Sequence, residues 1–287
     1  MARRKLPALL LVFVIGAVAV RGESWTIATY NVENYVATNR MTDAGYRQDY
    51  PKPEAQKRAL RQVILALQAD VLLLQEMGGE AYFAELRRDL KQAGLDYPFA
   101  VLLEADDPDR HVALLAKRPA ASIVRHTGIE FPYFGKNERV KRGLLEARFE
   151  TSAGPLVVFG LHLKSRFTDR PDDPKSAKRR IGEASAIRDI ILQRCPNPAA
   201  THLLVLGDFN DWTHGLASQL LCAHFKSADI RTQLSRFRTY PGLLPLLHLD
   251  HMYFDSALKL ERLRLYKSRT ALIASDHLPL IADFVVQ

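Results

Sequence analysis

The chain has 287 residues, of which 47% are hydrophobic and 25% are charged, and its formal net charge is +8. This composition is typical of a folded globular protein and excludes a collagen-like or mostly disordered chain. The basic charge favours a polyanionic partner such as nucleic acid or anionic lipid, although a modestly positive solvated surface would carry the same charge.

Residues 1–20 have the pattern of a secretory signal peptide. Three basic residues near the start precede a 15-residue apolar run, which contains the small-residue pattern Ala17-Val18-Ala19 near its end. The run is shorter than the roughly 20 residues that a membrane-spanning helix needs, so cleavage is favoured over an uncleaved anchor. We therefore expect export to the periplasm or the extracellular space, and one domain formed by residues 24–287.

Hydrophobic periodicity predicts more strands than helices. Strands are expected at 25–31, 70–76, 97–103, 111–117, 143–150, 155–162, 202–207, 249–254, 258–266 and 279–286. Helices are expected at 54–68, 80–93 and 176–194, where apolar residues recur at helical spacing, and an exposed loop is expected at 164–174.

No change of composition divides these elements, so they predict one α/β domain of two packed sheets with helices outside. Periodicity alone also fits an open doubly wound sheet. The first strand is not followed by the glycine-rich pattern G-x-G-x-x-G, which argues against a dinucleotide site.

Polar residues stand where the predicted apolar strands begin or end. A single carboxylate in such a place is usually a cap or a solvated turn residue. Here, however, polar residues occupy the ends of several predicted strands. These residues are Asn31, Glu76, His162, Asp208, Asn210, Asp250, Asp276 and His277. Several carboxylates buried together are costly unless cations or hydrogen bonds compensate their charge. Their clustering would therefore imply a hard cation.

The available ligands restrict the chemistry. Oxygens of Asp, Glu and Asn suit Mg²⁺, Mn²⁺ or Ca²⁺. The chain has no Cys-x-x-Cys and no His-Glu-x-x-His, so zinc has no support, and no Gly-x-Ser-x-Gly marks a serine nucleophile. The mechanism that remains is the attack of a water molecule on phosphorus beside a metal ion.

Six segments of the chain resemble motifs of the endonuclease/exonuclease/phosphatase superfamily. They are Thr-Tyr-Asn-Val-Glu-Asn (29–34), Leu-Gln-Glu (74–76), Gly-Leu-His-Leu-Lys-Ser (160–165), Leu-Gly-Asp-Phe-Asn-Asp (206–211), Leu-Asp-His (249–251) and Ser-Asp-His (275–277). Each alone is weak, whereas six in the family's order are specific. The resemblance implies a four-layer α/β sandwich, in which two mixed β-sheets pack face to face with helices outside.

The same resemblance assigns metal and water roles. Glu76 would be the principal metal ligand, with Asn31 beside it contacting metal or phosphate. Asp276 would be a further metal ligand, or a carboxylate that lies next to the ligands without binding the metal itself. Asp208 and Asn210 would position the attacking water or the phosphate, and Asp208 could also be a second metal ligand.

Two histidines would contact the phosphate from opposite sides. His277, oriented by Asp250, would act as an acid/base or as a charged stabiliser, and His162 would contact the scissile phosphate from the other side. The sequence leaves open whether His277 or Asp208 takes the proton.

Further basic residues could bind substrate. Arg142 matches the position where deoxyribonuclease I-like members place a phosphate-contacting arginine, although a solvated arginine at a strand start fits as well. Lys164 and Arg166, with the basic run 178–180, could extend a basic rim or form an ordinary solvated face. Trp212 could line the substrate groove or simply pack.

Departures from subfamily motifs bear on the substrate. Leu204 stands where inositol polyphosphate 5-phosphatases have a tryptophan, and no exposed apolar hairpin typical of secreted sphingomyelinases is evident. The chain is most similar to secreted bacterial nuclease-like members. We therefore expect a monomeric enzyme that uses Mg²⁺, or else Mn²⁺ or Ca²⁺, to cleave nucleic acid.

Three alternatives stay open. A phosphomonoesterase or a lipid-headgroup phosphodiesterase could use the same fold, and a catalytically silent phosphate-binding protein would be a different class. The two cysteines, Cys195 and Cys222, are expected to form a disulfide rather than two buried thiols.

Overall fold

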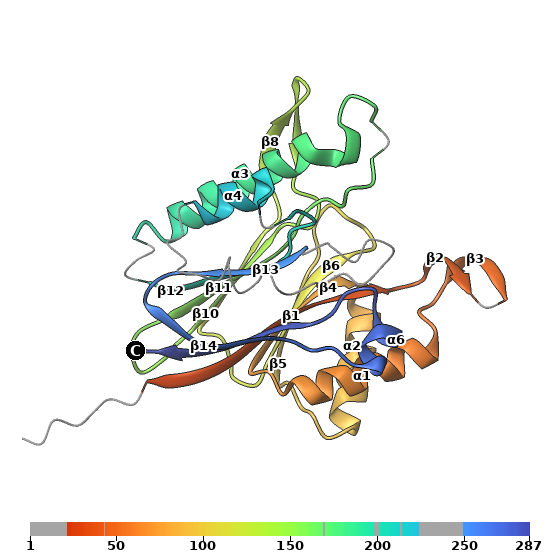
Figure 1. Ribbon diagram of the computed structural model, residues 1–287, viewed down its shortest axis with the longest axis horizontal. Helices are drawn as coiled ribbons and strands as arrows, with labels where there is room; N and C mark the ends of the chain where they lie inside the picture. The colour runs from red at the N-terminus through yellow and green to blue at the C-terminus, as the bar shows by residue number, and fades with distance from the viewer. Residues whose placement is uncertain (1–21, 43, 169, 198–200, 213, 224–248) are drawn as a thin grey trace, which may run out of the picture.

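Two β-sheets lie face to face in the computed structural model, which describes residues 22–287 except 43, 169, 198–200, 213 and 224–248 (Figure 1). The six-stranded sheet runs in the order β14 (Leu258–Leu265), β15 (Leu280–Val286), β1 (Glu23–Tyr35), β4 (Val71–Met77), β6 (His111–Ala116) and β5 (Phe99–Leu103). The five-stranded sheet runs in the order β13 (Asp250–Phe254), β12 (His202–Asp208), β11 (Leu156–His162), β10 (Leu144–Phe149) and β7 (Ser122–His126). The predicted signal peptide lies outside the described residues.

Both sheets are mixed, as predicted. β1 pairs with β4 in parallel and β11 with β12 in parallel, while the other neighbours are antiparallel. The carboxyl ends of two parallel strands meet at the same edge of a sheet. Each sheet therefore brings the polar ends of two of its strands together.

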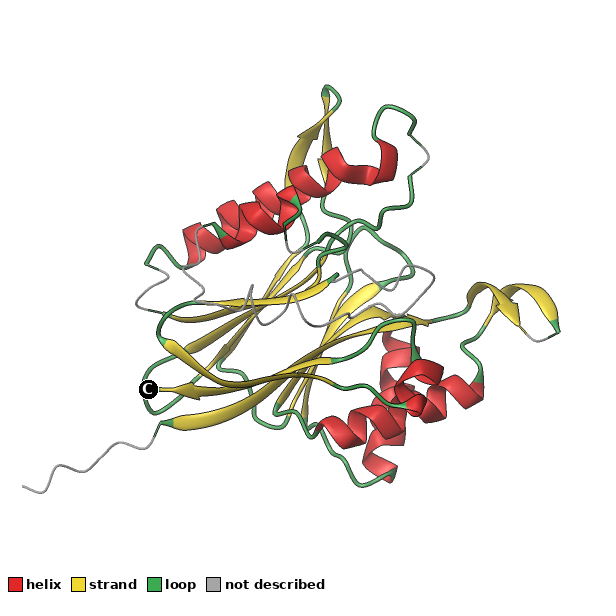
Figure 2. Cartoon of the chain, in the orientation of Figure 1, coloured by secondary structure: helices red, strands yellow, loops and turns green. Residues whose placement is uncertain are grey.

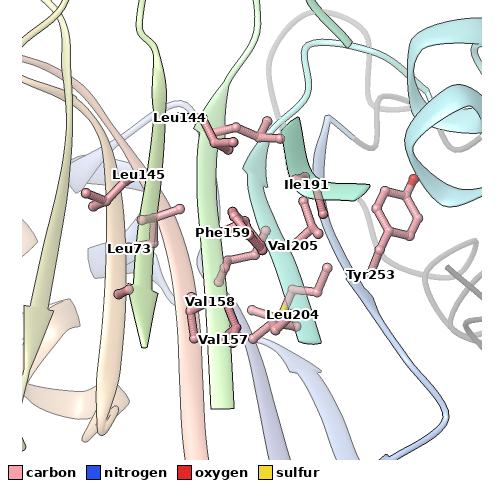
Figure 3. Close-up of a cluster of buried hydrophobic side chains, with 14 of the residues drawn as sticks. Leu73, Leu144, Leu145, Val157, Val158, Phe159, Ile191, Leu204, Val205 and Tyr253 are labelled. Atoms are coloured by element: carbon pink, nitrogen blue, oxygen red, sulfur yellow. The ribbon is translucent and has the colours of Figure 1, made fainter. Parts of the chain in front are cut away.

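The apolar strand β4 packs on both faces because successive side chains point to opposite sides. Leu73 belongs to the core between the two sheets, whereas Leu72 and Leu74 belong to the core under the helices. Figure 3 shows part of the core around Leu73 and Phe159. On the facing strand stands Gly160, where an added Cβ would lie 2.3 Å from Leu73 Cδ1. The sheets thus approach closely at this point.

Helices cover the outer faces of both sheets (Figure 2). Against the six-stranded sheet pack α1 (Glu54–Leu67), α2 (Glu80–Gln92) and α6 (Arg269–Ala274). Against the five-stranded sheet pack α3 (Ala177–Arg194) and α4 (Leu216–Cys222). The predicted four-layer α/β sandwich is confirmed.

Several short elements were not predicted. They are β7, α4, α6, the 3₁₀ helix η1 (Pro174–Ser176), and two hairpins, β2 (Thr38–Thr42) with β3 (Gly45–Tyr50) and β8 (Glu130–Tyr133) with β9 (Lys136–Arg139). The β2–β3 hairpin projects from the body of the molecule (Figure 1), and most of its residues are at least partly exposed. A strand without a buried face has no apolar alternation, so periodicity does not reveal it.

Two remaining predictions concern cysteines and membranes. Cys195 is a buried free cysteine, contrary to the expected disulfide, and the side chain of Cys222 lies outside the described residues. Among the helices that the structure describes, none is both long and apolar enough to cross a membrane.

Candidate active site

Strand register brings the predicted polar residues to one edge of the sandwich. In the six-stranded sheet, Asn31 pairs with the residue that precedes Glu76. In the five-stranded sheet, His162 pairs with Asp208, and Asp208 pairs with Asp250. Residues far apart in the sequence thus become neighbours.

Asn31 connects the two sheets through its side-chain amide. Its Nδ2 donates to Glu76 Oε1 at 3.3 Å and to Asp208 Oδ2 at 3.0 Å. Its Oδ1 accepts from the backbone N–H of Glu33 at 2.9 Å, and Glu76 Oε2 accepts from the backbone N–H of Asn34 at 2.9 Å. One buried amide therefore holds a carboxylate from each sheet.

His277 is held in one orientation by Asp250. His277 Nδ1 lies 2.7 Å from Asp250 Oδ2, which fits a donated hydrogen bond. The backbone N–H of His277 donates to Ser275 Oγ at 3.1 Å, and that hydroxyl donates to the carbonyl of Asn31 at 2.7 Å. The Nε2 edge of the ring then faces Asp208, with Nε2 3.8 Å from Asp208 Oδ2.

Burial and the charge of Asp250 shift the pKa values of both His277 and Asp208. Burial lowers the pKa of His277, but the charge and hydrogen bond of Asp250 outweigh it, and the pKa is raised well above its ordinary value. Burial raises the pKa of Asp208 to about 7, and the Asp250 carboxylate adds to the shift. His277 is therefore a buried cation beside a carboxyl group that exchanges its proton near neutral pH.

His162 approaches Asp208 from another side. Its Nε2 lies 3.6 Å from Asp208 Oδ2, and its side chain is buried. Burial lowers the pKa of His162 well below its ordinary value, and the positive charges of Arg142 and His277 lower it further. His162 is thus neutral where His277 is charged, the kind of pairing that separates acid from base roles.

Glu33 and Lys52 also belong to this site, although Glu33 had no assigned role within the motif at 29–34 and Lys52 lies outside all six motifs. Lys52 Nζ donates to the carbonyl of Glu33 at 3.0 Å and lies 3.6 Å from Glu33 Oε2, with its side chain 0% exposed. Glu33 Oε2 also accepts from the backbone N–H of Asp276 at 3.2 Å. The signal available in the sequence was a lysine between two prolines, Pro51 and Pro53.

This arrangement changes two pKa values. Burial lowers the pKa of Lys52, partly offset by the charge of Glu33. Burial raises the pKa of Asp276 to about 6, and the carboxylates of Glu33 and Glu76 add to the shift although His277 opposes it. The acids here outnumber the cations that balance them.

The backbone at the site is locally strained. Four non-glycine residues of the site region have positive φ values near the left-handed region, namely Glu33 (49°), Asn34 (49°), Glu76 (61°) and Asn210 (49°). Such conformations cost free energy and persist where the surrounding structure holds them. Asn210 is held by its backbone N–H donating to Asp208 Oδ1 at 2.8 Å and its Nδ2 donating to the Leu163 carbonyl at 3.0 Å.

The side chains of Arg142 and Lys164 already interact with other groups of the protein. Arg142 Nε lies 2.9 Å from Asp107 Oδ2, and the side chain is buried. Lys164 Nζ donates to the carbonyl of Phe167 at 2.6 Å and to Ser165 Oγ at 3.0 Å. Their substrate-binding roles stay predictions.

One acid–histidine group has a geometry that could hold a metal ion. Asp208, Asp250 and His277 each offer a ligand atom, and these atoms lie within 4.8 Å of one another. The 2.7 Å hydrogen bond between His277 and Asp250 already uses one nitrogen and one oxygen. A cation in this group would compete with that bond.

A second set of side chains carries oxygen donors of the kind that a hard cation prefers. Asn31, Glu76, Asp208 and Asp276 supply amide and carboxylate oxygens, the donors that Mg²⁺, Mn²⁺ and Ca²⁺ prefer. Burial and neighbouring acids raise the pKa values of Asp208 and Asp276 to about 7 and about 6, so the cluster lacks positive charge. A divalent cation would compensate the excess of acidic groups. The oxygen donors of these residues suit such a cation. Their individual ligand roles stay predictions.

Comparisons with solved structures show the same fold. An endonuclease/exonuclease/phosphatase from Beutenbergia cavernae superposes with a TM-score of 0.64 at 19% identity, over 92% of this chain and 72% of that one. Sphingomyelinase C from Streptomyces griseocarneus gives 0.59 at 16% identity, over 91% and 99%. A beta toxin mutant from Staphylococcus aureus with bound magnesium ions gives 0.58 at 17% identity, over 91% and 99%.

Comparison with sequences is more specific about the family. Curated protein sequences gave no significant match. The model of the Endonuclease/Exonuclease/phosphatase family, in contrast, matches residues 28–277 and so includes all six motifs. The chain belongs to the endonuclease/exonuclease/phosphatase family, whose members are hydrolases of phosphoesters.

Proposed function

We propose that this protein is a divalent-metal-dependent phosphodiesterase that cleaves nucleic acid by direct attack of water. The supporting observation is the position of Asp208 between two histidines. Its Oδ2 lies 3.6 Å from His162 Nε2 and 3.8 Å from His277 Nε2. Both distances exceed a hydrogen bond, and such contacts commonly tighten around a bound substrate.

Asp208 is the side chain that takes the proton from water in this proposal. In the metal-free protein burial raises its pKa to about 7, the direction that makes a carboxylate a stronger base. His277 is already protonated, because Asp250 holds its pKa well above the ordinary value, so it serves as a cationic stabiliser or acid at the phosphate. His162, being neutral, donates or accepts a hydrogen bond there.

A metal completes the charge balance of the site. Glu76, Asp276 and the amide oxygen of Asn31 would hold it, while the hydrogen bonds from Asn31 Nδ2 to Glu76 and Asp208 keep these two carboxylates close together. When bound, Mg²⁺ or Mn²⁺ would supply Lewis-acid stabilisation of negative charge on the phosphate oxygens. The beta toxin structure shows that magnesium ions can bind to a protein of this fold.

Nucleic acid and an exported location are the finer parts of the proposal. The formal net charge, +8 for the whole chain and +5 without Arg3, Arg4 and Lys5 of the signal-like segment, favours a polyanion, as do the neighbouring cations Arg142, Lys164, Arg166 and Arg180. The signal-like residues 1–20 favour the periplasm or the extracellular space, and we propose that the mature chain acts there as a monomer.

The test is to assay purified protein with Mg²⁺, Mn²⁺ or Ca²⁺ on plasmid DNA, RNA, sphingomyelin vesicles and a phosphomonoester. We expect metal-dependent cleavage of a polynucleotide, abolished by EDTA and strongly reduced in Glu76→Ala and His277→Ala. His202→Ala is the matched control, because His202 contacts the Gln287 carbonyl, outside the candidate active site. Absence of polynucleotide cleavage would refute the nuclease assignment.

A lipid-headgroup phosphodiesterase is the second candidate. The similarity of fold to sphingomyelinase C favours it. So do Phe167 and Trp212, which are 81% and 51% exposed on the loops that follow His162 and Asn210. Sphingomyelin hydrolysis without polynucleotide cleavage in the same assay would select this candidate.

A further inference from the structure

A half-buried Arg166 and an exposed Trp212 form a cation–π pair on the loops that leave the candidate active site. The guanidinium carbon of Arg166 lies 5.1 Å from the centroid of the Trp212 indole, and Trp212 is 51% exposed. Arg166 follows β11 and Trp212 follows β12, the parallel neighbours that end in His162 and Asp208. The pair thus belongs to the same edge of the sandwich as the catalytic candidates.

Hydrogen bonds hold the loop that carries Arg166. The carbonyl of the next residue, Phe167, accepts from Lys164 Nζ at 2.6 Å and from Ser176 Oγ at 2.9 Å. Arg180 Nη1 donates to the Lys164 carbonyl at 3.3 Å. The backbone on both sides of Arg166 is therefore fixed before any ligand arrives, which lowers the entropic cost of binding.

The segment of Trp212 is fixed in a similar way. The Asp211 carbonyl is hydrogen-bonded to His251 Nε2 at 2.9 Å, and Asp211 Oδ2 accepts from the backbone N–H of Ala217 at 3.0 Å. The Trp212 carbonyl accepts from the backbone N–H of Gly215 at 2.8 Å. An apolar ring is thus presented to solvent on an anchored backbone.

The charge around the pair discriminates between ligands. Burial lowers the pKa of Arg180; the Asp211 carboxylate opposes this shift, and the nearby positive charge of Arg166 adds to it. A choline headgroup brings a cation, which Arg166 on the indole face would repel. A nucleobase is a neutral plane that stacks on an aromatic ring or a guanidinium, and its phosphates are attracted by the same arginine.

We propose that Arg166 and Trp212 form a stacking platform for a base of single-stranded or unpaired nucleic acid, next to the phosphate that is cleaved. This inference rests on the proposed function and names its substrate class. Stacking accepts every base, so the platform would favour nucleotides over other phosphodiesters without reading a sequence.

Fluorescence gives a direct test. The chain has two tryptophans, and the other, Trp25, is 1% exposed, so a change on ligand binding reports on Trp212. The protein is titrated in EDTA with a single-stranded oligonucleotide and with a base-free oligomer of equal length and charge. We expect the oligonucleotide to quench the emission and to bind at least about fivefold more tightly than the base-free oligomer.

Variants separate stacking from charge and from folding. Trp212→Ala should weaken oligonucleotide binding by about 5- to 150-fold and remove the preference over the base-free oligomer. Because this variant lacks the reporter ring, its binding is measured by the fluorescence anisotropy of labelled oligomers. Trp212→Phe should keep most of that preference. Tyr46→Ala is the matched control, because Tyr46 is 58% exposed on the separate β2–β3 hairpin, and it should bind both oligomers like the parent protein.

The outcomes distinguish this inference from the proposed function. If the protein cleaves polynucleotides but Trp212→Ala keeps the parent preference for bases, the stacking platform is refuted and the nuclease function stands. If Trp212 emission responds to sphingomyelin vesicles and not to oligonucleotides, the platform is likewise refuted. If no polynucleotide is cleaved although the base preference depends on Trp212, the nuclease assignment alone fails.

Discussion

His277 Nδ1 lies 2.7 Å from Asp250 Oδ2, while the other nitrogen of the same ring faces Asp208 at 3.8 Å. Asp250 thereby determines both the orientation and the charge of His277. The ring can change its contact with Asp208 or with a substrate without losing its anchor.

Asp250→Asn should reduce kcat by about a hundredfold or more. The amide still fills the position, but the negative charge that raises the pKa of His277 is lost, and an orienting carboxylate of this kind contributes on that order. Steady-state hydrolysis measures the change. Asp255→Asn is the control, because Asp255 is buried and accepts from Leu203 N at 2.7 Å at the far end of β13, so it should affect stability and leave kcat within about threefold. Equal kcat in Asp250→Asn and the parent would contradict the oriented histidine.

Metal affinity should fall as the pH falls. Asp208 and Asp276, with pKa values raised by burial to about 7 and about 6, take up protons that a cation must displace. Below pH 6 the affinity for Mn²⁺ should drop by up to about tenfold per pH unit for each proton released. Calorimetry in two buffers of different ionisation enthalpy measures both quantities. Affinity that is constant from pH 5 to 8 would show that neither carboxyl takes part.

The thermal stability of the metal-free protein should fall as the pH rises. A carboxyl whose folded-state pKa exceeds the unfolded value of about 3.9 stabilises the fold most below that value, and this contribution is lost as the pH rises through the folded pKa. For Asp208 the window therefore runs from about 4 to about 7. Thermal unfolding in EDTA should show Tm falling across this window, and Asp208→Asn should flatten the decline. A decline of equal slope in the variant would exclude Asp208 as its source.

Lys52→Met should tighten divalent binding by about tenfold. The buried ammonium partly neutralises Glu33 beside Asp276 and Glu76, so its removal leaves the cluster more negative. Stability without metal should fall by about 1–3 kcal/mol, because Glu33 loses its partner. Calorimetry with Mn²⁺ and thermal unfolding in EDTA measure the two effects.

Lys57→Met is the matched control for that variant. Lys57 also forms an ion pair, with Glu85 at 2.6 Å, but it lies on α1 outside the site. It should leave Mn²⁺ affinity unchanged. Unchanged or weaker Mn²⁺ binding in Lys52→Met would show that Lys52 does not act on the ligand cluster.

Gly160→Ala should destabilise the fold by about 1–3 kcal/mol, because the new Cβ would lie 2.3 Å from Leu73 Cδ1 in the core between the sheets. Chemical denaturation measures the loss. The double variant Gly160→Ala/Leu73→Ala should lose less than the sum of the two single variants, since the smaller residue makes room. Additive losses would mean that the two positions do not touch.

The sequence by itself determined the elements and the family. A continuous apolar run as short as Val71–Met77 is typical of a buried strand, because a helix is usually longer, so local composition and length were sufficient there. The six motifs also identified the catalytic candidates, because each motif is a short run of consecutive residues that can be recognised without the structure. The β2–β3 hairpin escaped prediction because it buries no face, and β8, which buries Phe131 and Tyr133, escaped because four residues are too few to show a period.

Only the tertiary structure decided which groups face one another. Face-to-face packing of the two sheets placed Asp208 within hydrogen-bonding distance of Asn31, and packing also carried Lys52 into contact with Glu33. Charge and burial follow from that placement, so the cationic state of His277 and the raised pKa of Asp208 are properties of the assembled edge. No local pattern contains them, because electrostatic interactions depend on distance in space and on exclusion of water, and neither is a property of neighbours along the chain.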